Sequence, residues 1–297
     1  MAWIPITLLA ATFQILRTAR QHELRRYLNV NAAGFVRYAY GFPMALVAFA
    51  ITFVVFRAEL PTPPWRFWPI IAGAGVAQIL GTLALLRSFQ LRDFAIGTVY
   101  VKTEVILVAI VSAVALGEPL APLGWVAAIV CMVGVAWLAA PDKLSDVARS
   151  AADPAALMGV AAGLGFALAA AGIRGASNSL GDAPTWNRAL VTLTAMLAIQ
   201  ALINGAQLAL FDRAALRSVA VHWRPALPVG VLSLAGSACW ALAVTLTSAA
   251  KVRTLGQVEL VLAFAISAFW LHERHRRAEY LASGLVMLGV VGVVALG

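Results

Sequence analysis

Long apolar segments follow one another along almost the whole chain, separated only by short stretches that contain Pro, Gly or charged residues. A helix that crosses the hydrocarbon core of a bilayer needs about 20 mostly apolar residues, and these segments approach or reach that length. Charged residues make up 12% of the chain, about half of their share in an ordinary globular protein. The sequence therefore predicts an all-α integral membrane protein without a separate soluble domain.

The alternation of apolar runs and breaks predicts ten transmembrane helices. The longest polar-leaning break, residues 141–154, divides the chain almost in half and is interpreted as a connecting loop. It separates a first five-helix repeat, residues 1–140, from a second five-helix repeat, residues 155–297. The ten helices are expected at about 2–20, 31–57, 67–90, 94–116, 122–139, 155–175, 185–210, 225–247, 251–271 and 278–296.

The two halves resemble each other when the chain is shifted by 155 residues, the spacing between Glu104 and Glu259. The same shift brings Gly134 onto Gly289. Paired charges inside apolar segments are scarce, so the match indicates a true internal repeat. An odd number of helices per repeat inverts the second half in the membrane. Inverted halves typically enclose a central cavity that opens alternately to either side, so the repeat predicts a transporter.

Glu104 and Glu259 are each expected near the centre of a transmembrane helix. An ionisable side chain at that depth costs at least a few kcal/mol and usually marks a functional site. Either carboxylate could take up a proton and couple it to transport, or bind a cationic group of the substrate. The alternative is a structural ion pair with Lys102, Arg253 or an arginine of another helix.

Further side chains are candidates for the same cavity. Lys102 corresponds to Gln257 in the repeat, so the two half-sites differ, and a cation beside carboxylates would suit a zwitterionic or anionic metabolite. Lys102 could equally pair structurally or extend to the membrane interface. The remaining candidates are Tyr100, Ser112, Ser267, Gln78, Trp240, Arg37 and Arg188. For each of these, a structural role such as ordinary packing is the alternative.

The sequence contains no catalytic motif, phosphate-binding loop or cluster of metal ligands, so neither an enzyme nor a cofactor or metal is expected. The net charge of +9 does not predict nucleic-acid binding, because there is no basic face with interleaved aromatic residues. Lys and Arg concentrate in cytoplasmic loops. Alternate assignment of the loops places twelve of these residues on one side and four on the other, which predicts that both termini lie outside the cytoplasm.

Several segments resemble the EamA-type drug/metabolite transporter superfamily. They are ALGEPLAPLGWVAAIVCMVGVAWLA (115–139), WLHERHRRAEYLASGLVMLGVVGVVAL (270–296), RSFQLRDFAIGTVY (87–100) and VRYAYG (36–41). The resemblance implies ten helices in two inverted repeats around a central cavity, with both termini inside. This sequence departs from the family pattern at one point. Family members often carry Pro in the fourth and ninth helices, whereas here Glu104 and Glu259 stand near those places.

The repeat, the intramembrane acids and the resemblance together favour a secondary transporter that exports a small polar metabolite, such as an amino acid or organic acid, by alternating access. Proton coupling is part of this hypothesis. The expected partners are a small-molecule substrate and membrane lipid, in a monomer or homodimer within a bacterial cytoplasmic membrane. The alternatives are a lipid flippase or scramblase, in which Arg37 and Arg188 hold headgroups, and a non-transporting membrane scaffold.

Overall fold

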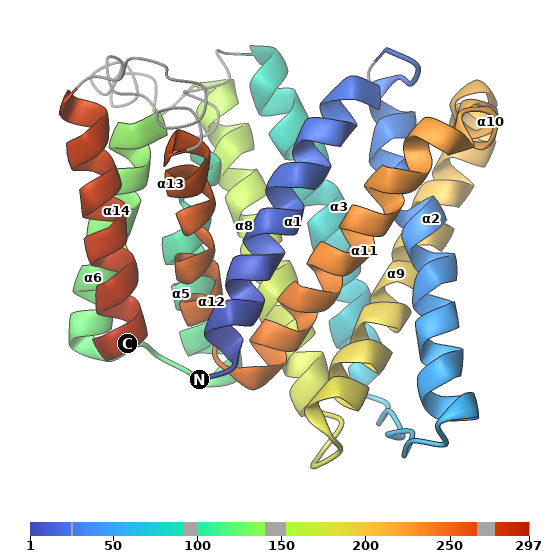
Figure 1. The fold of residues 1–297 in the computed structure, drawn as a ribbon, viewed down its shortest axis with the longest axis horizontal. Helices are drawn as coiled ribbons and strands as arrows, with labels where there is room; N and C mark the ends of the chain where they lie inside the picture. Colours follow the sequence, from blue (N-terminus) through green and yellow to red (C-terminus); the bar gives the residue numbers. More distant parts are fainter. Residues whose placement is uncertain (25, 92–99, 140–152, 266–276, 297) are drawn as a thin grey trace. The chain divides into compact units, whose positions relative to one another are not determined.

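The computed structural model describes residues 1–24, 26–91, 100–139, 153–265 and 277–296, and helices are the regular structure throughout these ranges. Figure 1 shows the elements in chain order. The first group is α1 (Trp3–Leu24), α2 (Val30–Ala50), the π-helical turn η1 (Ile51–Val55), α3 (Phe67–Leu91), α5 (Glu104–Leu116) and α6 (Pro122–Ala139). The second is α8 (Pro154–Asn178), α9 (Thr185–Phe211), α10 (Arg213–Val221), α11 (Trp223–Leu246), α12 (Ala249–Gly256), α13 (Val258–Ala265) and α14 (Arg277–Leu296).

Many of these helices match the length and apolarity of a membrane span. Within the described ranges, six are long and apolar enough to cross a bilayer: Asn31–Val55, Phe67–Leu85, Pro154–Asn178, Thr185–Phe211, Trp223–Leu246 and Arg277–Leu296. Three shorter apolar helices accompany them: Trp3–Arg17, Glu104–Leu116 and Pro122–Leu138. The ten predicted ranges all overlap helices, but the number of membrane crossings stays a prediction.

The chain forms two compact units, and each unit takes helices from both halves of the sequence. The first unit consists of Met1–Gly75 and Ile173–Leu246. The second consists of Val76–Gly172 and Thr247–Gly297. The predicted connecting loop, residues 141–154, lies almost entirely outside the described residues. Neighbouring helices in each unit therefore come largely from opposite repeats.

In the first unit, α1 packs against α11, and α2 packs against α9. A side-chain hydrogen bond from Trp186 to Thr52 joins the start of α9 to η1, which continues α2. Near the other end, a Cβ atom added to Gly205 would lie 3.4 Å from the ring of Phe35. The numbering rises along one helix as it falls along the other, so α2 and α9 are antiparallel.

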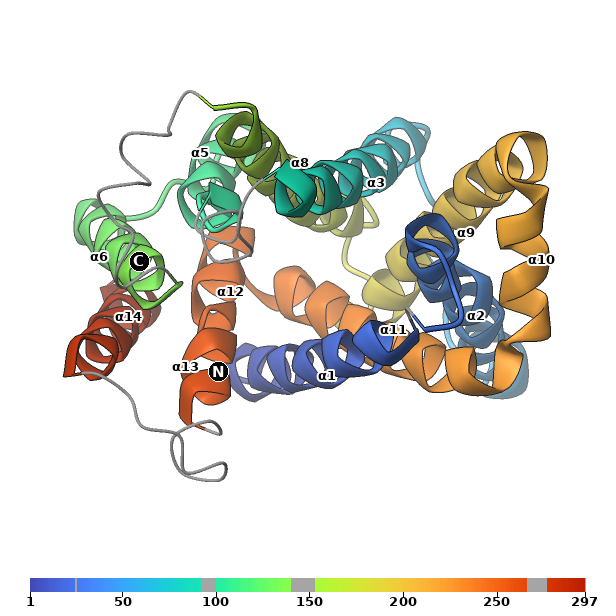
Figure 2. The same cartoon turned by 90° about the horizontal axis from the view of Figure 1, so that it is seen from above.

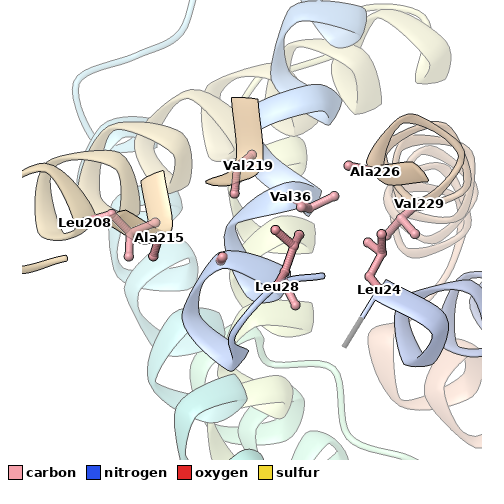
Figure 3. Close-up of a cluster of buried hydrophobic side chains, with 10 residues drawn as sticks. Leu24, Leu28, Val36, Leu208, Ala215, Val219, Ala226 and Val229 are labelled. Carbon is pink, nitrogen blue, oxygen red and sulfur yellow. The ribbon is translucent and has the colours of Figure 1, made fainter. Parts of the chain in front are cut away.

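One end of the first unit is closed by the short helix α10. Its inward residues Ala215 and Val219 are four positions apart and therefore share a helical face. They join an apolar cluster with α1, α2, α9 and α11, which Figure 3 shows. The Tyr40 hydroxyl of α2 also donates a 2.8 Å hydrogen bond to the Val219 carbonyl. These contacts hold α10 against the helix ends.

In the second unit, α6 and α14 lie side by side (Figure 2). A Cβ atom added to Gly134 would lie 2.6 Å from the backbone nitrogen of Val286. A Cβ atom on Gly289 would clash with the backbone of Cys131. Gly134 corresponds to Gly289 in the repeat, and Cys131 corresponds to Val286, so the two contacts are equivalent. The two helices are therefore antiparallel and related by an approximate twofold axis. Glycine is needed at both places because the backbones approach so closely.

Candidate functional site

The two helices that carry the predicted acids are interrupted at equivalent positions. Lys102 and Thr103 form a turn before α5, and Gln257 forms a turn between α12 and α13. The Thr103 N–H bonds to the Tyr100 carbonyl at 3.3 Å, and the Gln257 N–H bonds to the Thr254 carbonyl at 3.0 Å. These bonds span three residues instead of the four of a regular α-helix, which marks a tight, non-α turn.

As a result, both acids stand at helix starts. Glu104 lies in the first turn of α5 and Glu259 in the first turn of α13. The prediction that each acid lies near the centre of a continuous helix is therefore wrong in detail. The partial positive charge of a helix N-terminus favours a carboxylate there. Interrupted helices also supply polar backbone groups at membrane depth where the chain is enclosed by protein.

A glycine of α8 accommodates the first interruption. A Cβ atom on Gly163 would lie 2.9 Å from the Val101 carbonyl oxygen and 3.0 Å from both the Glu104 nitrogen and the Thr103 hydroxyl. The Thr103 hydroxyl itself donates a 2.6 Å hydrogen bond to the Tyr100 carbonyl, which satisfies one acceptor of the interrupted helix. The turn before α5 is thus packed directly on the backbone of α8.

Two ion pairs join the acids to bases of the opposite repeat. Lys102 Nζ lies 2.6 Å from Glu259 Oε1, and Arg253 Nε lies 3.0 Å from Glu104 Oε1. We call these four residues the charge cluster. Their side chains retain between 9% and 16% of their accessible surface, so they are largely enclosed. The pairs are crossed, because each contains one residue from each sequence repeat.

The charge cluster is electrically balanced, with two cations and two anions. Balance matters because removing one partner of a buried ion pair typically costs about 3–5 kcal/mol, through the charge left unpaired. The Glu104–Arg253 contact is an ion pair without the alignment of a hydrogen bond, and Glu104 Oε1 accepts no hydrogen bond from the described residues. Glu259, in contrast, accepts a hydrogen bond from Lys102. Glu104 Oε1 is therefore less well satisfied than Glu259 Oε1.

Three other predicted site residues lie in the second unit together with the charge cluster. Ser112 is fully buried on the same face of α5 as Glu104, and its hydroxyl makes no hydrogen bond with described groups. Tyr100 lies before the interruption and packs on Ala156 of α8. Gln78 is a partly buried residue of α3. Ser267 lies outside the described residues.

Three predicted residues belong to the first unit instead. Trp240 donates from its indole nitrogen to Gln14 at 3.2 Å. Arg37 stacks over the ring of Tyr38. Arg188 donates to the Gly181 carbonyl at 3.2 Å. Because α2 and α9 are antiparallel and each arginine lies near the start of its own helix, Arg37 and Arg188 are at opposite ends of this helix pair.

Two further polar residues are functional candidates beyond those that the sequence predicts. Arg253, which the sequence predicts only as a structural ion-pair partner, lies against Glu104. Gln257 is 4% exposed, and its amide oxygen finds no hydrogen-bond donor within the described ranges. Both lie in the same apolar segment as Glu259, and this local concentration of polar residues was the available signal. Only the tertiary fold showed that Arg253 faces the acid of the other repeat.

Comparison with known protein families identifies the family of the chain. The EamA-like transporter family matches residues 1–140 and 153–295, which is almost the whole chain in two parts. The chain belongs to the EamA-like transporter family. This EamA-like protein is accordingly a multi-pass integral membrane transporter of the drug/metabolite transporter superfamily, whose members are transporters and not enzymes.

A solved structure supports the fold of the EamA-like protein. A crystal structure of another protein matches it with a TM-score of 0.72 over 99% of this chain and 96% of the other. The two sequences are 15% identical, so this likeness concerns the fold alone. A search of curated proteins found no match.

Proposed function

We propose that this EamA-like protein is a secondary transporter that exports a small polar metabolite, zwitterionic or anionic, by alternating access across a bacterial cytoplasmic membrane. Its charge cluster is the substrate and coupling site. The proposed architecture has ten transmembrane helices in two inverted five-helix repeats around a central cavity. Export is the direction that the family resemblance favours.

The observation that carries this proposal is the crossed pairing of the charge cluster. Each ion pair ties an acid of one repeat to a base of the other. Alternating access requires the two repeats to move with respect to each other, so contacts between them must open and re-form. A buried ion pair opens readily only if another charge replaces the lost partner. A charged substrate supplies that replacement.

The balance of the charge cluster indicates the substrate class. A zwitterion carries one ammonium and one carboxylate, so it can occupy one acid and one base at once and leave the total charge of the site unchanged. Arg253 offers a planar guanidinium suited to a carboxylate, and Glu259 offers an acceptor for an ammonium group. A proton taken up by Glu104 would release Arg253 for a substrate anion, which is the proposed route to proton coupling.

Two packing features support the inverted arrangement. The reciprocal glycine contacts relate α6 to α14 by an approximate twofold. The second helices of the two repeats, α2 and α9, are likewise antiparallel. Equivalent helices that run in opposite directions are what inverted repeats require.

Transport in proteoliposomes tests the proposal. Glu104→Gln should abolish proton-driven transport of a labelled amino acid or organic acid, whereas Glu59→Gln, at an exposed acid of the first unit, should transport normally. A reversed pair, Lys102→Glu with Glu259→Lys, retains opposite charges and separates the two roles. We expect this variant to be folded but inactive, because the site would present its charges to the substrate in the wrong places. Full transport by the reversed-pair variant would show that the charge cluster has a structural role only and does not bind the substrate.

A further inference from the structure

The second notable concentration of charge lies at the α10 end of the first unit. Figures 1 and 2 show α10 lying across the ends of α9 and α11 instead of continuing either helix. The two long helices have the length and apolarity of membrane spans. A short helix across their ends therefore runs along the membrane surface.

The helix α10 is amphipathic in the way that this position requires. Ala215 and Val219 point into the apolar cluster of the first unit. Arg213 and Arg217 also lie four residues apart, on the opposite face, and both are exposed. The Asp212 carboxylate caps the helix by accepting from the Ala215 N–H at 3.0 Å. One face is thus anchored in protein, and the other presents guanidinium groups.

The corner between α1 and α2 adds to this basic face. Asn29 donates to Asp212 at 3.2 Å, beside the start of α10. The ring of Tyr27 lies 5.7 Å from that of His222, just beyond its end. The corner therefore follows α10 along its length, which brings the exposed Arg26 to the same surface.

Arg224 completes the set, and we call Arg26, Arg213, Arg217 and Arg224 the basic corner. Arg224 is exposed and stacks at 5.5 Å on the ring of Trp223. Among the acids described there, Asp212 has one carboxylate oxygen on the α10 backbone and the other on Asn29. Arg213 Nε also donates to the Ala209 carbonyl at 2.9 Å, at the end of α9. Within the part of the chain that the structure describes, none of the four arginines forms an ion pair.

The surroundings of the basic corner are those of a membrane–water interface. Phe211 is 84% exposed and Val221 is 65% exposed, which suits contact with acyl chains. Trp223 and Tyr27 are half-exposed aromatic residues with polar ring atoms, a type concentrated at the level of lipid headgroups. Exposed apolar side chains, aromatic rings and guanidinium groups therefore occur together at α10 and its two ends.

The opposite end of the first unit lacks this imbalance. The arginines near it, Arg57, Arg66 and Arg188, are accompanied by the acids Glu59 and Asp182. Asn187 donates to the Glu59 carbonyl, which places these residues at the α2–α9 end remote from α10. The charge asymmetry found in the loops is therefore present in the folded unit.

We infer that the basic corner is a binding surface for anionic phospholipid headgroups of the surrounding bilayer. Guanidinium groups bind phosphate through paired, charge-assisted hydrogen bonds. Anionic lipids of the cytoplasmic leaflet attract juxtamembrane arginines. The inference is independent of the proposed transport function and agrees with the orientation predicted from the loop charges.

The test compares lipids on the purified full chain in neutral detergent, with the apparent unfolding temperature as the readout. Phosphatidylglycerol should raise this temperature, because a ligand that binds the folded state stabilises it. Phosphatidylcholine and free glycerol phosphate should not. The effect should weaken as salt rises, since exposed charges are screened.

Two sets of variants locate the lipid surface. Replacing all four basic-corner arginines by Gln should weaken phosphatidylglycerol binding by roughly 600-fold, about fivefold for each arginine, and replacing them by Lys should weaken it much less, because charge is the main determinant. Replacing Arg57 and Arg66 by Gln is the matched control and should change little. If the fourfold Gln variant does not fold, Arg217→Gln alone should weaken binding about fivefold.

Three outcomes would overturn the inference. The first is an unchanged phosphatidylglycerol response in the Gln variants. The second is an equal loss in the Arg57 and Arg66 control. The third is equal stabilisation by phosphatidylcholine or by free glycerol phosphate, which would show a general lipid effect or a soluble phosphate site.

Discussion

The ion pair between Lys102 and Glu259 allows a quantitative prediction. At 2.6 Å and an effective dielectric constant of about 20, the attraction of two unit charges is about 6 kcal/mol. Transferring both groups from water costs several kcal/mol each, so the net contribution of the intact pair is small. The loss of one partner has a different consequence, because the remaining charge stays enclosed without compensation.

We therefore expect Glu259→Gln alone and Lys102→Met alone each to destabilise the protein by about 3 kcal/mol. This is the lower end of the range of about 3–5 kcal/mol for loss of one partner of a buried ion pair. The lower value applies because the two side chains keep 13% and 14% of their accessible surface, so some water still reaches them. In a chain of this size, 3 kcal/mol lowers the unfolding temperature by roughly 6 °C. The double variant, which removes both charges, should be less destabilised than either single variant.

The assay is thermal unfolding of the detergent-solubilised chain, followed by tryptophan fluorescence. Lys251→Gln is the control, because Lys251 lies on the same helix α12 and makes no described ion pair. If the double variant loses as much stability as the two single variants added together, the two charges do not interact and the argument for the charge cluster fails.

Three further variants test the packing around the site and the corner. Gly289→Ala should destabilise the protein by about 2–3 kcal/mol, because the new Cβ meets the α6 backbone; Gly284→Ala, which has open space, should not. Gly163→Ala should reduce transport as well as stability, because its Cβ presses on the turn that carries the acid of α5, whereas Gly73→Ala should leave both unchanged. Tyr40→Phe should cost about 1 kcal/mol by removing a hydrogen bond to α10. Unfolding temperatures and proteoliposome transport give all three results, and an equal effect of each glycine variant and its control would contradict the packing argument.

Much of the helical organisation was predictable from the sequence. The predicted range 122–139 coincides with α6, and 185–210 differs from α9 by one residue. Apolar length and Pro or Gly punctuation decide such boundaries locally, so no tertiary information is needed. The short helix α10 was missed because its nine residues, two of them arginines, are far fewer than the roughly 20 of a membrane span.

The candidate site was only partly predictable. The sequence marked Glu104, Glu259 and Lys102, since charges in apolar segments are rare and costly. It did not reveal the interruption at Lys102–Thr103, because residues 100–103 contain no proline or glycine. For the interruption at Gln257, the preceding Gly256 was the available signal. An interruption of this kind depends on what replaces the lost backbone hydrogen bonds. At the first turn the Thr103 hydroxyl supplies one of them, to the Tyr100 carbonyl, and Gly163 of α8 allows the turn to pack closely.

By itself, the sequence determined that the chain is a helical membrane protein with an internal repeat and with acids in equivalent places, because apolar length, scarcity of charge and repetition are properties of the linear chain. Only the tertiary structure decided how these charges are paired. Lys102 is two residues from Glu104 but binds Glu259, and Glu104 instead faces Arg253. The interruption turns neighbours in the chain away from each other, and the packing of α5 against α12 brings distant charges together at ion-pair distance, where the enclosed site favours neutral pairs.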